Sequence, residues 1–174
     1  MAKVLVRAPD VTGAAGHGNA PAKGAAGRVK GPAKSSGDFG TPVTITCDQK
    51  PGYALSIKKS SIVLAQIDPS DPKQKWDKDD SWGDGFAIVN TDTNQAIQRP
   101  PDGAGHRLLL VKYDSANRDD SVMWKQNNSK SSPIREHDDT TLVFDSTKRG
   151  DDTVVIVAKE SNDATSQKWT IVNK

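Results

Sequence analysis

Short apolar runs separated by turn-forming residues dominate the chain from residue 41 onward. Many of these runs are rich in β-branched side chains, and several alternate apolar with polar residues, which is the pattern of a half-buried strand. Clusters of Pro, Gly and Asp between the runs are typical of turns. The runs are 43–46, 54–57, 62–64, 86–89, 108–111, 142–144, 154–157 and 169–172. No window keeps a helical period, so the pattern predicts an all-β domain, either a sandwich or a barrel.

Three tryptophans divide this region into similar segments and favour one of those architectures. Trp76, Trp124 and Trp169 follow one another at intervals of about 45 residues. Each tryptophan ends a segment in which a strand-like run leads into a polar loop rich in Asp, Ser or Asn. One such unit cannot bury its own hydrophobic face, so three units are expected to close around a pseudo-threefold axis. The repeat therefore predicts a β-trefoil with the three tryptophans in a shared core.

The composition separates residues 1–40 from the rest of the chain. This segment is rich in Gly and Ala, has Phe39 as its single aromatic residue, and carries six basic against two acidic side chains. So few large apolar side chains cannot offset the entropy lost on ordering. We therefore expect a disordered basic tail over residues 1–40 and a folded domain over residues 41–174. An arm that binds nucleic acid or anionic lipid is the alternative for the tail, but its bases are sparse and stacking aromatics are missing.

From the cysteine content and the hydropathy we expect a protein of a reducing compartment inside the cell. A single cysteine, Cys47, excludes an intramolecular disulfide and fits a reducing compartment. No apolar stretch is long enough to span a membrane, and the N-terminus lacks the apolar segment of a signal peptide. The net charge of +2 gives no overall argument for nucleic acid. We expect neither membranes nor nucleic acid among the partners.

The sequence lacks the patterns that catalysis or metal binding would need. The three histidines lack metal-ligand spacing, and His137 beside two aspartates fits a solvated loop. The acidic clusters lack the alternating oxygen ligands of a calcium loop. A glycosidase needs two carboxylates on facing strands, whereas Asp145 is the only acid expected outside a turn or loop. We therefore expect a non-catalytic protein without cofactor or metal.

Ordered blocks within the domain are similar to those of a known lectin family. Residues 74–76 and 167–169 are Gln-x-Trp motifs, which close the repeats of ricin-B-like lectins. The blocks that resemble, in order, the Euonymus-lectin-like family of plants are 41–57, 63–76, 86–97, 110–124 and 153–171. The resemblance covers residues 41–174, and members often carry a variable N-terminal extension. It implies a β-trefoil that binds glycans or glycoproteins in the cytoplasm and nucleus, often in the response to stress.

The resemblance also implies a sugar site in the third repeat. Carboxylates and amides bind vicinal hydroxyls, and an aromatic ring stacks on the C–H face of the sugar. Asp145 and Gln167 stand at the family's Asp and Gln positions, and Lys159 and Asn162 are further candidates for hydrogen bonds to the sugar. However, Val157 and Lys159 stand where this family tends to place Trp.

The first two repeats offer fewer candidates for a sugar site. Ser56 takes the Asp position in the first repeat and Ala96 in the second, where Val122 also replaces the Gln. Trp82 lies outside the repeat pattern and is either a lid on the barrel or an exposed stacking surface that replaces the lost aromatic. The missing tryptophans leave a second hypothesis open. In it, the sugar site has degenerated and the trefoil binds other proteins, such as signalling proteins.

Overall fold

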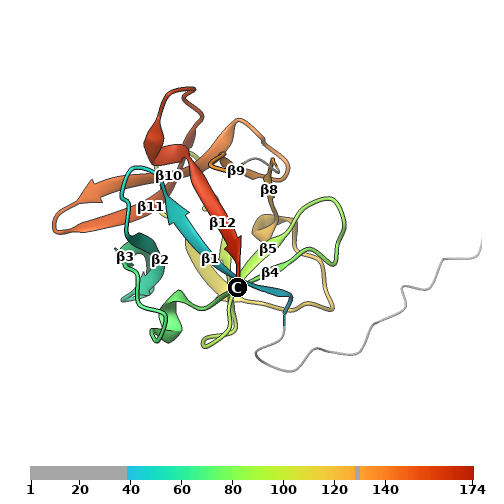
Figure 1. Cartoon of the computed structure of the whole chain (residues 1–174). Helices are drawn as coiled ribbons and strands as arrows, with labels where there is room; N and C mark the ends of the chain where they lie inside the picture. Colours follow the sequence, from blue (N-terminus) through green and yellow to red (C-terminus); the bar gives the residue numbers. More distant parts are fainter. Residues whose placement is uncertain (1–38, 128–129) are drawn as a thin grey trace, which may run out of the picture. The chain divides into compact units, whose positions relative to one another are not determined.

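The computed structural model describes residues 39–127 and 130–174, and these residues form an all-β domain (Figure 1). Within them, twelve strands and three short 3-10 helices follow one another, and the strands join in one curled sheet. The predicted all-β class is therefore confirmed. The tail expected over residues 1–40 lies outside the described residues, except for Phe39 and Gly40.

The strands fall into three repeats of four, and a 3-10 helix precedes the last strand of each repeat. The first repeat contains β1 (Thr41–Cys47), β2 (Tyr53–Lys58), β3 (Ser61–Gln66), η1 (Pro72–Gln74) and β4 (Trp76–Asp79). The second contains β5 (Ala87–Asn90), β6 (Gln95–Gln98), β7 (Leu109–Lys112), η2 (Asp120–Val122) and β8 (Trp124–Gln126). The third contains β9 (Ile134–Glu136), β10 (Leu142–Arg149), β11 (Asp152–Lys159), η3 (Thr165–Gln167) and β12 (Trp169–Asn173). The predicted threefold repeat is present in the order of the elements.

The pairing of the fourth strands closes the barrel. The fourth strand of each repeat pairs with the first strand of the next, β4 with β5 and β8 with β9. The same rule joins β12 to β1, with Val43 opposite Asn173, so the last strand of the domain lies beside the first (Figure 1). The edges that an open sheet would leave unpaired are thereby removed at this seam.

The three repeat tryptophans lie in the shared core, as predicted. Trp76 is 2% exposed, and Trp124 and Trp169 are fully buried. The ring of Phe144 makes edge-to-face contacts with Trp124 at 4.6 Å and with Trp169 at 5.9 Å between ring centroids. Aromatic pairs favour this geometry and stabilise a core by more than their buried area alone.

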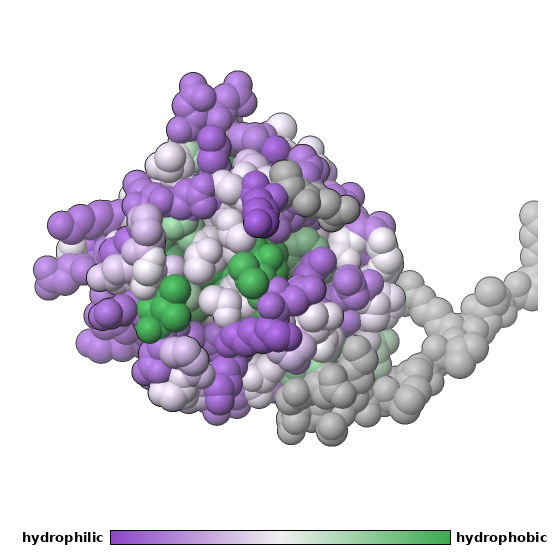
Figure 2. Space-filling view, viewed as in Figure 1, coloured by the Kyte–Doolittle hydropathy of each residue, from purple (hydrophilic) through white to green (hydrophobic). Residues whose placement is uncertain are grey.

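The outer surface of the domain is largely polar. On the face shown in Figure 2, hydrophilic residues prevail and apolar residues are exposed only in small patches. Among the described residues, the exposed large hydrophobic side chains are Ile67, Leu109 and Val172. In that part of the chain we find no helix long and apolar enough to cross a membrane.

Candidate functional site

The hydrogen bonds of the core tryptophans show which residues are equivalent in the three repeats. Each indole nitrogen donates a hydrogen bond to a backbone carbonyl on the second strand of its own repeat. The pairs are Trp76 with Leu55 (2.9 Å), Trp124 with Ile97 (3.0 Å) and Trp169 with Phe144 (3.1 Å). The residue after each carbonyl therefore occupies the same place in its repeat. These three equivalent residues are Ser56, Gln98 and Asp145.

This alignment corrects the position expected for the second repeat. Ala96 was expected to replace the Asp, but Gln98 is the residue that corresponds to Asp145. Ala96 is fully buried and pairs with Val111, whereas Gln98 pairs with Leu109. Residues two apart lie on the same face of a strand, so the apolar–polar alternation could not separate these two positions.

In the third repeat, Gln167 holds Asp145 in place. The Gln167 amide nitrogen donates to Asp145 Oδ2 at 3.1 Å and to the backbone oxygen of Lys159 at 3.0 Å, while its oxygen accepts from Ser161 N at 2.7 Å. Gln167 is 3% exposed, and both of its amide protons are used. The side chain therefore positions Asp145 and the loop after β11, rather than facing a ligand itself.

The first repeat shows which of these contacts are structural. Gln74 makes the same two backbone contacts, donating to Gln66 O at 2.8 Å and accepting from Asp68 N at 3.0 Å. Ser56, the counterpart of Asp145 in this repeat, is 3% exposed and brings no carboxylate. The Gln of the motif thus holds a loop in both repeats, and its contact to a carboxylate belongs to the third repeat.

The surface beside Asp145 is aliphatic. Asp145 is half-buried and pairs with Ile156, which packs against Val63 and Val154. Val157, one of the two positions where the family places Trp, is fully buried in the main core. Its side chain therefore points inward and is not an outer platform for a sugar.

Lys159 and Asn162 lie apart from the Asp145–Gln167 pair. Lys159 pairs with Leu142 and Asp145 with Ile156, and because side chains alternate along a strand, Lys159 is on the opposite face of the hairpin from Asp145. The exposed side chains of Lys159 and Asn162 line a depression of 590 Å³ together with Arg135. The four predicted site residues therefore form two separate pairs, and only the backbone oxygen of Lys159 meets Gln167.

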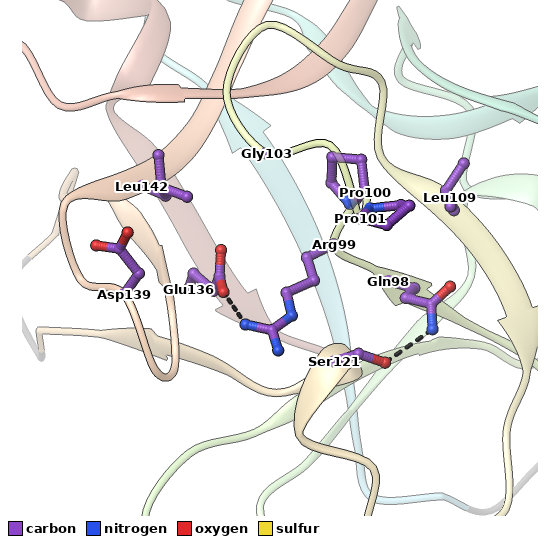
Figure 3. Close-up of a pocket in the computed structure, with 10 residues that line it drawn as sticks. All are labelled: Gln98, Arg99, Pro100, Pro101, Gly103, Leu109, Ser121, Glu136, Asp139 and Leu142. Atoms are coloured by element: carbon purple, nitrogen blue, oxygen red, sulfur yellow. Dashed lines mark hydrogen bonds and ion pairs between the residues drawn. The ribbon is translucent and has the colours of Figure 1, made fainter.

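A depression of 650 Å³ opens beside Gln98 in the second repeat (Figure 3). The Gln98 amide donates to Ser121 Oγ at 2.7 Å, and Arg99 forms an ion pair with the buried Glu136 of the third repeat. The hydrogen bond that Arg99 donates to Glu136 raises the pKa of the Arg99 guanidinium above its ordinary value. Leu109 lies on the Gln98 side of the depression, opposite the third-repeat residues. The sequence alone could not indicate this site, because residues of the second and third repeats line it together.

Trp82 lies in the loop before β5. It is half-buried and packs against a small cluster that includes Tyr113 and Met123. Tyr113 donates to the buried Asp79 at 2.9 Å, and burial raises the pKa of the Tyr113 hydroxyl. Trp82 lines neither the depression beside Gln98 nor the one beside Lys159. Its role as a stacking surface stays a prediction.

No group of three or more His, Cys, Asp or Glu side chains that could hold a metal gathers within residues 39–127 and 130–174. The sites described at Asp145 and beside Gln98 consist of carboxylate, amide and guanidinium groups beside aliphatic side chains. Such groups bind hydroxyl-rich ligands through hydrogen bonds.

Comparison with known proteins places the domain in a family. No protein-family model matches the chain. Ricin B-like lectin EULS3 of Arabidopsis thaliana is 31% identical over 147 residues, which are 74% of this chain and 46% of that protein. Ricin B-like lectin R40G3 of Oryza sativa subsp. japonica is 34% identical over 93 residues, 48% of this chain and 45% of that protein. This domain belongs to the plant ricin B-like lectins. The chain spans less than half the length of these relatives.

Solved structures confirm the fold of this ricin B-like domain. The designed threefold-symmetric protein ThreeFoil matches with a TM-score of 0.63 at 13% identity, over 76% of this chain and 99% of that one. The Macrolepiota procera ricin B-like lectin, solved with lactose, matches with a TM-score of 0.60 at 18% identity, over 81% of this chain and 99% of that one. The predicted β-trefoil and the predicted resemblance to plant lectins are therefore confirmed.

Proposed function

We propose that this domain binds carbohydrate without catalysing a reaction, and that Asp145 is the central ligand-binding group of the third repeat. The observation that carries the proposal is the hydrogen bond from Gln167 to Asp145 Oδ2, which fixes the carboxylate of a half-exposed residue. A fixed carboxylate accepts hydrogen bonds from sugar hydroxyls without first losing rotamer freedom. The lectin relatives support the same class of ligand.

The affinity expected of this site is low. On the face of the hairpin that carries Asp145, β11 presents Ile156 and the partly exposed Ala158, so no aromatic ring covers the apolar face of a sugar there. Aliphatic side chains bury less area than an aromatic ring and lack its favourable ring geometry. We expect a monosaccharide to bind with a dissociation constant on the order of millimolar, or about −4 kcal/mol.

Titration of the isotope-labelled full chain with sugars, followed by amide NMR shifts, tests this function site by site. We expect sugar-dependent shifts around Asp145 and Gln167, and Asp145→Asn should weaken this response about tenfold because a charged acceptor is lost. The matched control is Asp163→Asn, which removes an exposed carboxylate from a turn of the same repeat. The absence of shifts for every sugar at millimolar concentration would overturn the function.

The second candidate function is a protein-interaction module with a degenerate sugar site. The aliphatic surroundings of Asp145 and the inward position of Val157 favour it. In this case the domain captures protein partners, and capture is equally strong after enzymatic removal of their glycans. Loss of capture after deglycosylation supports the lectin instead.

The proposal includes a nucleocytoplasmic location and a role in stress. Cys47 supports the location because, as the single cysteine of the chain, it cannot form an intramolecular disulfide, which fits a reducing compartment. A fluorescent fusion in plant cells, with salt stress applied and withheld, tests both parts. Accumulation in the secretory pathway contradicts the location, and unchanged protein levels and unchanged tolerance contradict the stress role.

A further inference from the structure

Basic side chains gather around the β2–β3 and β10–β11 hairpins. Within the described part of the chain, six of them form a surface that we call the basic end: Lys50, Lys58, Lys59, Arg107, Lys148 and Arg149. We infer that the basic end binds an acidic, extended segment of a partner protein. This inference goes beyond sugar binding and is independent of it, because it involves neither Asp145 nor Gln167.

Two neighbouring residues of β11 connect four of these side chains. The contacts are Lys50 Nζ to Thr153 Oγ1 at 3.2 Å, Lys58 Nζ to Asp152 Oδ1 at 2.5 Å, and the strand pairs Lys148–Thr153 and Arg149–Asp152. Strands β3 and β11 also pair directly, with Leu64 opposite Thr153. The β2–β3 and β10–β11 hairpins therefore lie side by side (Figure 1).

Arg107 extends this surface to the loop before β7. Its Nη1 donates to Ser61 Oγ at 3.2 Å, and Ser61 is the partner of Lys58 across the β2–β3 hairpin. From the other hairpin, Arg149 Nη2 donates to the backbone oxygen of Gly105, in the same loop, at 3.1 Å. Segments of all three repeats therefore build the basic end.

The basic end differs in charge from the rest of the domain. Residues 41–174 carry 18 basic and 20 acidic side chains. Beside its six bases, the basic end holds two acids of the β10–β11 hairpin, Asp151 and Asp152, so it is positive, whereas the remaining 12 basic and 18 acidic side chains are negative overall. Opposite charges steer two surfaces together and fix their orientation, so the partner of the basic end should be acidic.

The backbone at Lys59 gives a second, independent reason to assign a function to this surface. Lys59 and Ser60 form the two-residue turn of the β2–β3 hairpin, with φ angles of 48° and 61°. Positive φ at both positions is typical of Asn-Gly turns and is unfavourable for a lysine. Such strained residues cluster at functional sites. Here the turn holds the exposed Lys59 between Lys58 and the Ser61 that Arg107 contacts.

An acidic protein segment fits the basic end better than nucleic acid or a membrane does. Single-stranded nucleic acid stacks its bases on aromatic rings, but Lys50 Nζ lies 3.9 Å from the centroid of the Tyr53 ring and covers it. A flat anionic membrane would meet the turn of the β10–β11 hairpin, where Asp151 is exposed. An extended acidic segment can instead run along the sides of the hairpins and pair with their bases.

Binding of a fluorescein-labelled peptide of alternating Glu and Ser residues to the full chain, measured by fluorescence anisotropy, tests the inference. We expect the peptide to bind, with an affinity that falls as the salt concentration rises. Lys59→Glu combined with Lys148→Glu should weaken binding about tenfold at low salt. The matched control combines Lys75→Glu with Lys112→Glu, which changes the net charge equally at exposed lysines elsewhere in the domain.

Lys59→Asn separates peptide binding from folding. Asn adopts a positive φ more readily than Lys, so this variant should have a higher melting temperature and yet bind the peptide more weakly. A higher melting temperature with unchanged peptide binding overturns the role of Lys59.

The other outcomes separate this inference from its rivals and from the proposed function. Equal weakening in the two double variants overturns it, because binding then follows the net charge and not the basic end. Tighter binding of a single-stranded oligonucleotide or of phosphatidylserine vesicles than of the peptide overturns the choice of partner. The sugar-dependent shifts around Asp145 should be the same in both double variants, so failure of this inference leaves the proposed function in place.

Discussion

At the scale of single residues, the glutamine of the Gln-x-Trp motif serves two purposes: it holds a loop, and in the third repeat it also positions a carboxylate. Gln74 and Gln167 hold equivalent loops through the same backbone contacts, and Gln167 also fixes Asp145. In the second repeat Val122 replaces this Gln, and Asp114 Oδ1 accepts the loop N–H of Ala116 at 2.9 Å instead. The glutamine of the motif therefore indicates a particular loop structure. It indicates ligand binding only where a carboxylate lies beside it.

Replacement of each motif glutamine by alanine separates the two purposes. Gln74→Ala and Gln167→Ala each leave a part-buried carbonyl and a loop N–H without their partner, so each should lower the free energy of unfolding by about 1–3 kcal/mol. Only Gln167→Ala should also weaken the sugar-dependent shifts around Asp145. Urea denaturation measures the first effect and NMR titration the second. Equal weakening of these shifts in both variants would contradict this division.

At the scale of elements, a chain of polar contacts around Asp84 joins three segments. Arg118 contacts Asp84 at 2.8 Å and Asp120 at 2.5 Å, and the ring of His137, just after β9, contacts Asp84 at 3.1 Å. The hydrogen bond from Arg118, supported by His137, lowers the pKa of Asp84 from 3.8 to about 2. The loop before β5, the loop before η2 and the end of β9 are thereby linked.

The contribution of Asp84 to the stability of the fold should decrease as the pH falls. Because the pKa of Asp84 is lower in the folded state, its contribution to stability is present above pH 3.8 and is lost as the pH falls toward about 2. Asp84→Asn should therefore lower the melting temperature at neutral pH, and the difference from the unchanged protein should shrink across this interval. Thermal unfolding followed by circular dichroism at each pH measures it. A difference that is constant down to pH 2 would refute the role of the Asp84 charge.

At the scale of the whole domain, the three tryptophans tie each repeat to the common core. Each indole fills the interior and also satisfies a buried carbonyl on the second strand of its repeat. The three repeats share one core, so damage to one of them should lower the stability of all three.

Trp124→Phe tests this coupling. The smaller ring leaves a cavity and an unpaired Ile97 carbonyl, so we expect the free energy of unfolding to fall by about 2–4 kcal/mol in a single transition. Trp82→Phe, at the half-buried tryptophan outside the repeat pattern, is the control and should cost less. Unfolding monitored by fluorescence and by circular dichroism should give one midpoint. Two separate midpoints would show that the repeats unfold independently.

The sequence by itself determined the trefoil. The β-branched runs and the spacing of Trp76, Trp124 and Trp169 predict three units that need a common core, because no unit can bury its own hydrophobic face. The resemblance to the lectin family also singled out Asp145 and Gln167 as a pair, which the structure joins by a hydrogen bond.

Only the tertiary structure decided which side chains share a surface. A shift of two residues keeps the same strand face, so the sequence could not distinguish Gln98 from Ala96. The pairing of β10 with β11 places Lys159 on the face opposite to Asp145. The exposure of Leu109, against the burial of its counterparts Val63 and Ile156, depends on which strands pack over each repeat. Such contacts join residues far apart in the chain, and local patterns do not encode them.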